Sequence, residues 1–191
     1  LNAQNPASAQ SMYNVAVGHN TGASITTGIQ NTLTGGLAGD ALTVGSYNTA
    51  LGTTALGGDT QGSKSTAIGY STLVNQNFTS ATDTFNTAVG YEAGAAVTTG
   101  VQNTFIGGLS ADANTTGANN TALGYFSLTG NTTGSGNVAL GKAALEANTT
   151  ADNNTAVGKE ALRLNTTGAN NVAVGKDALD SNTTASNNVA I

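Results

Sequence analysis

The residues of this chain that are able to do acid–base or metal chemistry are few and scattered. There is one histidine, His19, and no cysteine, so neither a thiolate metal site nor a cysteine nucleophile is possible. No carboxylate and hydroxyl are grouped around His19 in the sequence, and we expect it to be an exposed surface residue. Phosphate-binding glycine loops and zinc-ligand spacings are absent as well. The sequence therefore predicts a protein that is not an enzyme, with no catalytic site, no metal site and no cofactor.

Two motifs are partly similar to known binding or modification sites. Gly57-Gly58-Asp59 is similar to part of a calcium-binding nonapeptide repeat, but the full Gly-Gly-x-Gly-x-Asp spacing does not occur. Asn-x-Thr triplets match glycosylation acceptors, and they begin at Asn114, Asn131, Asn148, Asn165 and Asn182. Because such regular repetition fits a recurring turn, we interpret these triplets as structural, with glycosylation as the less favoured alternative.

Aromatic side chains are the remaining candidates for binding, because their faces stack on sugar rings. Tyrosines directly follow three of the repeated glycines described below, and two phenylalanines lie in a longer segment between the first two of these tyrosines. The candidate ligand face consists of Tyr70, Tyr91, Tyr125, Phe78 and Phe85. We expect the loop that carries the phenylalanines to lie beside Tyr70 and Tyr91. Two alternatives remain: the tyrosines shield a sheet edge, and the whole segment is a spacer whose recognition site lies elsewhere.

A short repeat must position all of these side chains. It is Asn, then Thr or Val, Ala, an aliphatic residue and Gly, as in Asn154 to Gly158, where Val157 is the aliphatic residue. The first copy starts at Asn14, and the copies end at Gly18, Gly52, Gly69, Gly90, Gly124, Gly141, Gly158 and Gly175, with looser copies ending at Gly35 and Gly107. The interval between successive glycines is constant, with the single exception of a longer interval from Gly69 to Gly90. A fixed short period predicts a stack of similar coils, each of which covers its neighbours.

Composition supports order but limits the possible partners. Only 8% of the residues are charged and the net charge is −5, without a basic patch, so nucleic acid is not an expected partner. No apolar run approaches the roughly 20 residues that span a bilayer, so membrane insertion is not expected either. Low charge alone is compatible with disorder, but here the β-branched residues recur at fixed places, which favours a folded array.

Each repeat predicts one short strand followed by turns. Thr155-Ala156-Val157 alternates and is rich in β-branched residues, whereas the segment before it is packed with Asn, Thr and Asp. A helix over residues 159–164 is the rival interpretation, but six residues between turns are too few for a stable helix. The prediction is an all-β, parallel β-roll or β-solenoid with coils of about 17 residues, the interval between successive glycines. Within each column of equivalent residues, stacked Asn amides are then able to form a hydrogen-bonded ladder.

Alternation within the strand separates the side chains into an inner and an outer set. If the narrow interior takes Ala156 and its equivalents, Val157 and its equivalents face outward and need a partner. The outward set is Val17, Leu51, Ile68, Val89, Ile106, Leu123, Leu140, Val157, Val174 and Ile191. The alternative places these aliphatic residues inside and predicts a monomer.

The chain divides into a leading segment or cap at residues 1–13 and a repeat array at 14–191. We expect the four additional residues of the longest coil to form a loop at about residues 76–85.

The repeat resembles the head repeats of YadA-like trimeric autotransporter adhesins, whose motif runs Ser-Val-Ala-Ile-Gly. It resembles still more closely the Asn-Thr-Ala-x-Gly and Asn-Thr-Thr-Gly-x-Asn-Asn arrays of phage tail-fibre proteins, over residues 14–191. The resemblance implies a left-handed parallel β-roll and an intertwined or side-by-side homotrimer. The repeat is longer than that of the adhesin heads, and no family binding residue carries over, because the shared motif is structural.

From this resemblance we expect an extracellular protein that is a structural and adhesive part of a phage tail fibre. Its partners are then further copies of itself and a glycan or receptor on the host surface. The first alternative is a trimeric adhesin or filament on a bacterial cell surface. A lesser alternative is an ice- or crystal-binding β-solenoid, because Thr149, Thr166 and Thr183 are regularly spaced.

Overall fold

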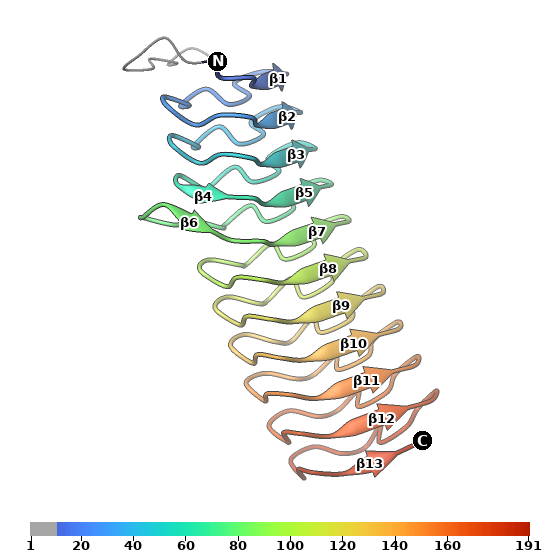
Figure 1. The fold of residues 1–191 in the computed structure, drawn as a ribbon. Coiled ribbons are helices and arrows are strands. Elements are labelled where there is room, and N and C mark those ends of the chain that lie inside the picture. The colour runs from blue at the N-terminus through green and yellow to red at the C-terminus, as the bar shows by residue number, and fades with distance from the viewer. Residues whose placement is uncertain (1–10) are drawn as a thin grey trace.

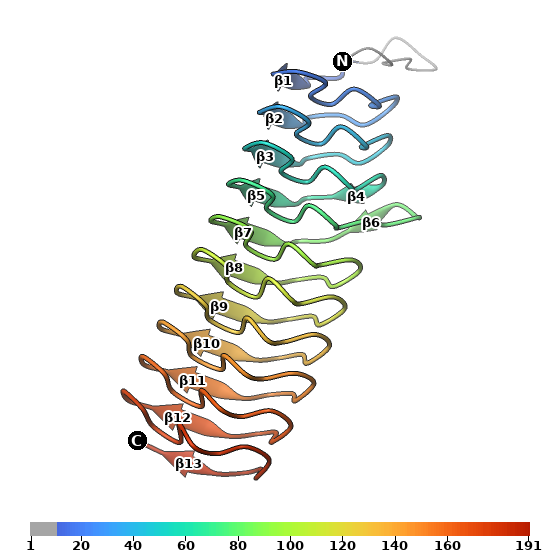
Figure 2. The same cartoon turned by 180° about the vertical axis from the view of Figure 1, so that it is seen from behind.

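The chain forms an elongated stack of coils with one three-residue strand in almost every coil. The computed structural model describes residues 11–191, so most of the predicted leading segment 1–13 lies outside the described residues. Its 11-stranded parallel sheet has the order β1-β2-β3-β5-β7-β8-β9-β10-β11-β12-β13, and the strands follow one another along the stack (Figure 1; Figure 2 shows the reverse side). The strands are β1 (Val15–Val17), β2 (Thr32–Thr34), β3 (Thr49–Leu51), β5 (Thr66–Ile68), β7 (Thr87–Val89), β8 (Thr104–Ile106), β9 (Thr121–Leu123), β10 (Val138–Leu140), β11 (Thr155–Val157), β12 (Val172–Val174) and β13 (Val189–Ala190). The predicted all-β solenoid is confirmed.

Equivalent residues of successive coils lie side by side, as the repeat predicts. Ala156 of β11 pairs with Ala139 on one side and with Ala173 on the other. The Thr155 N–H donates to the Asn171 carbonyl at 2.8 Å, which continues the ladder from coil to coil. Residues 159–164 form turns, so the helical alternative is excluded, and no helix occurs in residues 11–191.

The repeated glycine makes the corner at which the chain leaves each strand. At Gly141 φ is +132°, a conformation that L side chains rarely adopt, and a Cβ there would lie 2.6 Å from the Gly158 carbonyl oxygen. Both a positive φ and a close backbone approach therefore require glycine at this corner.

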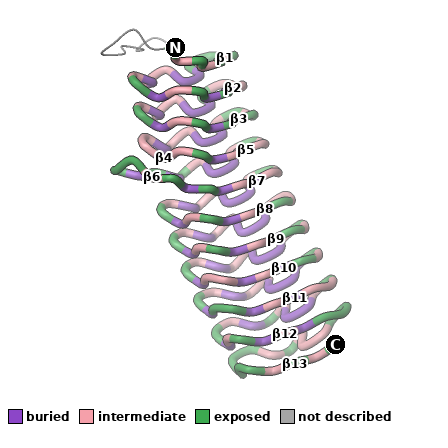
Figure 3. Tube along the Cα trace, in the orientation of Figure 1, coloured by how far each residue is buried: buried purple, intermediate pink, exposed green. Residues whose placement is uncertain are grey.

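The interior is narrow, and it takes the alanine in the middle of each strand. Ala122, Ala139 and Ala156 are fully buried, and buried positions recur coil after coil along the tube in Figure 3. Opposite them lies a buried leucine column four residues after the repeated glycine, with Leu56, Leu73, Leu128, Leu145 and Leu162. The aliphatic residue at the end of each strand therefore faces outward, and the alternative that placed it inside is wrong.

Two large strand residues depart from the alanine column, and glycine compensates for both. Phe105 replaces the alanine in β8, and Gly94 stands where other coils have the buried leucine. A Cβ at Gly94 would lie 2.9 Å from Phe105 Cδ2. Similarly, a Cβ at Gly39 would lie 3.1 Å from Leu33 Cδ1 in β2. A larger residue in the strand column is therefore matched by a smaller residue in the leucine column, so that the combined volume of the two stays similar from coil to coil.

Two asparagine ladders follow the stack. In the predicted column, Asn48 Oδ1 accepts the Ser65 N–H at 2.9 Å and Asn31 Oδ1 accepts the Asn48 N–H at 2.9 Å. A second column, seven residues after the repeated glycine, links side-chain amides directly: Asn131 Nδ2 donates to Asn114 Oδ1 at 2.7 Å. The predicted ladder exists, but its recurring bond runs from backbone N–H to side-chain oxygen, and the amide-to-amide ladder belongs mainly to the second column.

The coil with four additional residues carries a small parallel sheet of β4 (Gly62–Ser63) and β6 (Thr82–Asp83). This pair lies at the edge where the main strands begin, and the loop before β6 projects beyond its neighbours (Figure 1). The segment predicted as a loop, about 76–85, includes β6, and Gln76 and Phe78 at its start are buried. Within residues 11–191 no helix is long and apolar enough to cross a bilayer.

Candidate functional site

The outer face of the main sheet carries an aliphatic column along the stack. Val17 is 58% exposed, Leu51 48% and Leu123 47%, which is high for aliphatic residues in a regular sheet. The column consists of Val17, Leu51, Ile68, Val89, Ile106, Leu123, Leu140, Val157, Val174 and Ile191, with Thr34 as its one interruption. We call it the outer aliphatic column. Contiguous exposed apolar surface of this kind is typical of interaction sites.

The threonine columns do not form a free hydroxyl array. Thr149 Oγ1 donates to the Thr166 carbonyl at 3.1 Å, and Thr166 Oγ1 donates to the Thr183 carbonyl at 3.0 Å. The next residue in each coil, for example Thr150, is exposed but belongs to a turn. The pair therefore offers one free hydroxyl per coil rather than a flat two-row lattice, and nothing in this geometry favours ice or crystal binding.

The five predicted ligand residues do not form one face. Tyr70 and Tyr91 follow the ends of β5 and β7, and their rings stack with centroids 5.4 Å apart at 14°. The loop before β6 lies at the opposite edge of the stack (Figure 1), so the expected position of this loop beside the two tyrosines is wrong. The reason is that the additional residues precede the strand, whereas the tyrosines follow it.

The two phenylalanines are poorly placed for binding. Phe78 is 7% exposed, and its backbone N–H donates to the buried Asp59 carboxylate at 3.2 Å. Phe85 is exposed, but Lys64 Nζ lies over its ring, 5.1 Å from the centroid, while pairing with Asp83 at 2.6 Å. Phe78 therefore belongs to the interior, and a cation covers one face of Phe85.

A buried polar cluster holds the longest coil together. Gln76 Nε2 donates to Asp59 Oδ2 at 2.7 Å and to Ser65 Oγ at 2.8 Å. Gln76 Oε1 accepts from Asn86 Nδ2 at 2.8 Å. Ser65, where the asparagine column is interrupted, also bonds to Thr84 Oγ1 at 2.7 Å. Every polar atom named here has a partner, so the cluster is structural and leaves no donor or acceptor free for a ligand.

The remaining predicted features have plain structural roles. His19 is exposed, as expected. Asn114, Asn131, Asn148 and Asn165 are fully buried in the second ladder, so their side chains are not accessible to glycosylation in the folded chain. No cluster of three or more His, Cys, Asp or Glu able to hold a metal ion occurs in the part of the chain that the structure describes.

Two of the three lysines that directly follow a repeated glycine pair with the next residue of their own coil. Lys159 Nζ lies 3.1 Å from Glu160 Oε1, and Lys176 Nζ lies 3.0 Å from Asp177 Oδ2. The Glu92 carboxylate, as a hydrogen-bond acceptor and as a negative charge, raises the pKa of Tyr91. These contacts are typical of a solvated surface.

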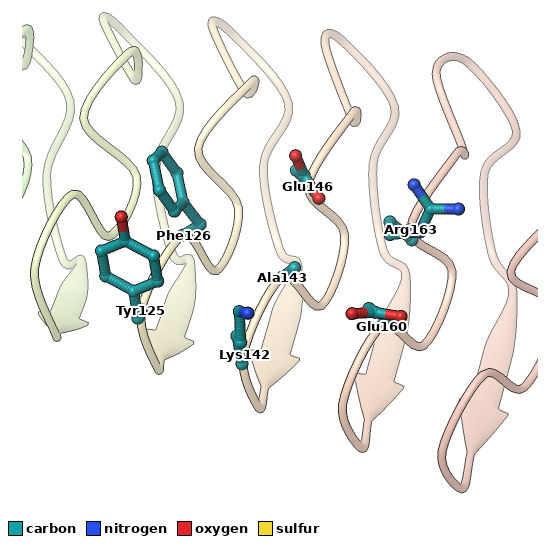
Figure 4. A pocket seen from close by; sticks show the side chains of 7 residues that line it. All are labelled: Tyr125, Phe126, Lys142, Ala143, Glu146, Glu160 and Arg163. Atoms are coloured by element: carbon teal, nitrogen blue, oxygen red, sulfur yellow. The ribbon is translucent and has the colours of Figure 1, made fainter.

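An open hollow of about 380 Å³ lies on the surface of the last third of the stack. Its lining comes from three successive coils: Tyr125, Phe126, Lys142, Ala143, Glu146, Glu160 and Arg163 (Figure 4). Of these, only Tyr125 was among the candidate ligand residues predicted from the sequence. No motif marks the hollow in the sequence. The available signal was that Ala143 is small where the equivalent residue of the preceding coil, Phe126, is large; both lie two residues after a repeated glycine.

Two contacts fix the walls of this hollow. Tyr125 and Phe126 pack edge to face, with centroids 4.3 Å apart at 78°. Arg163 is held by Asp180 at 3.4 Å. The Ser181 hydroxyl and the Arg163 guanidinium lower the pKa of Asp180, so the stabilisation from this carboxylate is present above the ordinary Asp pKa and is lost as the pH falls through the lowered value.

Comparison of the chain with protein families, with characterised proteins and with solved structures finds no match. The outer aliphatic column and the hollow are therefore the two surface features that bear on function.

Proposed function

We propose that this chain is a segment of a homotrimeric fibre that projects from a phage particle and contributes to host-surface attachment. A trimeric adhesin on a bacterial surface is the second choice, because it needs the same assembly. The observation that carries the proposal is the outer aliphatic column, which runs along the eleven-stranded sheet and which no element of residues 11–191 covers. The repeat resemblance supplies the biological setting.

The outer aliphatic column is long enough to drive association. Ten steps between eleven strands, at ~4.8 Å each, give an apolar line of about 48 Å. Full burial of an aliphatic side chain is worth ~1.5–3 kcal/mol, and several members of the column are a third to a half exposed. Covering them in an assembly therefore gains only part of that value per residue, but the gain is repeated in nearly every coil.

Further copies of the same chain fit this column better than an unrelated partner does. The coils present this column at a regular spacing, so a second copy offers a matching aliphatic residue at every step except that of Thr34. Cyclic symmetry closes such an assembly without leaving an exposed column. The resemblance favours three chains and a left-handed coil, and both stay predictions.

Light scattering on the purified chain tests the assembly. A trimer is expected to have three times the mass of one chain, which is 18.7 kDa. The double variant Val157→Asp, Val174→Asp places charges in the outer aliphatic column and is expected to give single chains. Its matched control, Thr167→Asp with Thr184→Asp, adds the same charge at exposed turn positions and is expected to stay assembled.

Attachment is tested separately, on the parent particle or cell. Val157→Asp with Val174→Asp is expected to lower adsorption to the host, and the control pair is expected to leave it unchanged. A wild-type mass of one chain in solution would refute the assembly. Normal adsorption of a particle that carries a dissociated segment would refute the contribution to attachment.

A further inference from the structure

The hollow near Tyr125 exists because one column of the repeat carries an alanine between two much larger residues. Position two after the repeated glycine is occupied by Asn20, Leu37, Thr54, Ser71, Glu92, Leu109, Phe126, Ala143, Glu160 and Asp177. Ala143 is the smallest of these residues, and it lies between two of the larger ones. The side chains of Phe126 and Glu160 therefore stand on either side of a gap one coil wide, with Ala143 as its floor (Figure 4).

One wall of the hollow is aromatic. Tyr125 is half exposed, and its ring is braced edge to face against Phe126. Unlike Tyr70 and Tyr91, which cover each other's faces, Tyr125 has no stacked partner among the described residues. An aromatic face in this position is open to a flat apolar surface.

The other sides of the hollow carry charges of both signs. Lys142 and Arg163 are positive, Glu146 and Glu160 are negative, and their sum is zero. Glu160 is paired with Lys159, and Arg163 is oriented by Asp180. Lys142 and Glu146 make no ion pair within residues 11–191. A donor group and an acceptor group are thus free on the same hollow as the aromatic wall.

We propose that this hollow binds one neutral hexopyranose unit of a surface glycan. A sugar ring presents a C–H face that packs on an aromatic ring, and its hydroxyls donate to carboxylates and accept from lysine or arginine. An anion would meet two carboxylates, a cation would meet Lys142 and Arg163, and a purely apolar ligand would cover these charges without partners. The volume of about 380 Å³ is at the small end of the ~300–1,000 Å³ range of ligand pockets, which fits a single ring or two.

This inference rests on the proposed attachment function in one respect only, namely that the glycan belongs to a host surface. Binding of the sugar by the purified chain does not depend on that setting. Because the hollow is open to solvent, affinity for one ring is expected to be weak, and copies brought together in a fibre would strengthen attachment through effective concentration.

Saturation-transfer NMR on the purified chain tests the proposal, with the methyl glycosides of glucose, galactose, mannose and N-acetylglucosamine as probes at millimolar concentration. At least one glycoside is expected to receive saturation. Ala143→Leu fills the hollow and is expected to weaken binding by roughly tenfold or more. Leucine is compatible with this backbone, because φ is 55° at Ala143, 59° at Leu37 and 55° at Leu109 in the same column.

The matched control is Asn20→Leu, which makes the same kind of change in the same column outside the hollow and is expected to leave binding intact. Glu146→Gln and Phe126→Ala are expected to weaken binding without filling the hollow, and they replace Ala143→Leu if that variant melts early. Absence of transfer to all four glycosides, or unchanged transfer in these hollow variants, would overturn the proposal. Light scattering on the same samples separates the outcomes: sugar binding by single chains supports the hollow and refutes the fibre, and an assembled chain without sugar binding does the reverse.

Discussion

At the residue scale, the residue found at one position of the repeat depends on the residue at the position that it contacts across the interior. Leu33 and Phe105 interrupt the alanine column, and the sequence alone offered no reason for them. The structure supplies one, since a Cβ at Gly39 would crowd Leu33 and a Cβ at Gly94 would crowd Phe105. The compensating glycine belongs to the column that elsewhere holds leucine. That this column packs against the strand column is seen only in the folded coil.

A double-mutant cycle tests this compensation. Phe105→Ala alone leaves a cavity and is expected to lower the free energy of unfolding by ~3–5 kcal/mol. Gly94→Leu alone is also expected to destabilise, because a Cβ at Gly94 already approaches the Phe105 ring at 2.9 Å. The double variant recreates the arrangement of Leu128 with Ala139 in the β10 coil. It is therefore expected to recover most of the loss.

Urea denaturation of the four proteins measures the cycle, and the coupling energy is the difference between the double loss and the sum of the single losses. Additive losses would show that the two positions do not share one volume.

At the element scale, the repeat predicted the regular coils, whereas the longest coil required the structure. The strands, the glycine corner and the asparagine column follow from spacing and residue type. The place of the loop at about 76–85 did not follow, because the position of Phe78 and Phe85 relative to Tyr70 depends on which edge of the coil holds the additional residues. The role of Gln76 in the buried polar cluster was not predictable either, because the surrounding sequence contains many polar residues and nothing distinguishes this one.

Gln76 bonds to three buried polar side chains at the coil where Ser65 replaces the asparagine of the column. Removing the Gln76 side chain tests how much this cluster stabilises the longest coil. Gln76→Ala leaves Asp59 Oδ2 without a donor and takes one partner each from Ser65 and Asn86. An unsatisfied buried polar group costs ~1–3 kcal/mol, so we expect a loss of stability on the order of 3 kcal/mol.

Thermal unfolding followed by circular dichroism measures this effect. Thr79→Ala, which removes an exposed hydroxyl in the same loop, is the control and is expected to change little. Equal stability of Gln76→Ala and Thr79→Ala would show that the cluster contributes nothing.

At the scale of the whole molecule, the sequence predicted a parallel β-solenoid, and the structure confirms it. The sequence left two alternatives for the strand faces, and the structure selects the one with the alanine inside and the aliphatic residue outside. The hollow was not predictable from any motif, because it arises from one small residue between coils whose side chains approach each other only in the stack. The assembly lies beyond a single chain, and its geometry is open to a direct test.

The absence of cysteine makes that test simple. In a cyclic trimer built on the outer aliphatic column, the same residue of each chain approaches the axis. Leu140→Cys, in the eighth of the eleven strands, is therefore expected to form disulfide-linked pairs of chains under mild oxidation, visible as dimers in a denaturing gel. Thr167→Cys, exposed at a turn, is expected to stay largely unlinked.

Register is tested by mixing chains that carry the cysteine at different levels of the stack. Val17→Cys and Leu140→Cys lie far apart along the axis, because seven strand-to-strand steps in the sheet order separate β1 from β10. In a parallel, in-register fibre, a chain with one of these cysteines forms a disulfide only with a chain that has the same cysteine. This holds even when the two variants are unfolded together and refolded as mixed assemblies. In a fully overlapping antiparallel pair, β1 of one chain faces β13 of the other and β10 faces β5, so loss of self-linkage at both levels would contradict the parallel trimer. Efficient linkage between Val17→Cys and Leu140→Cys would contradict an in-register fibre, whereas self-linkage at both levels is the outcome that supports it.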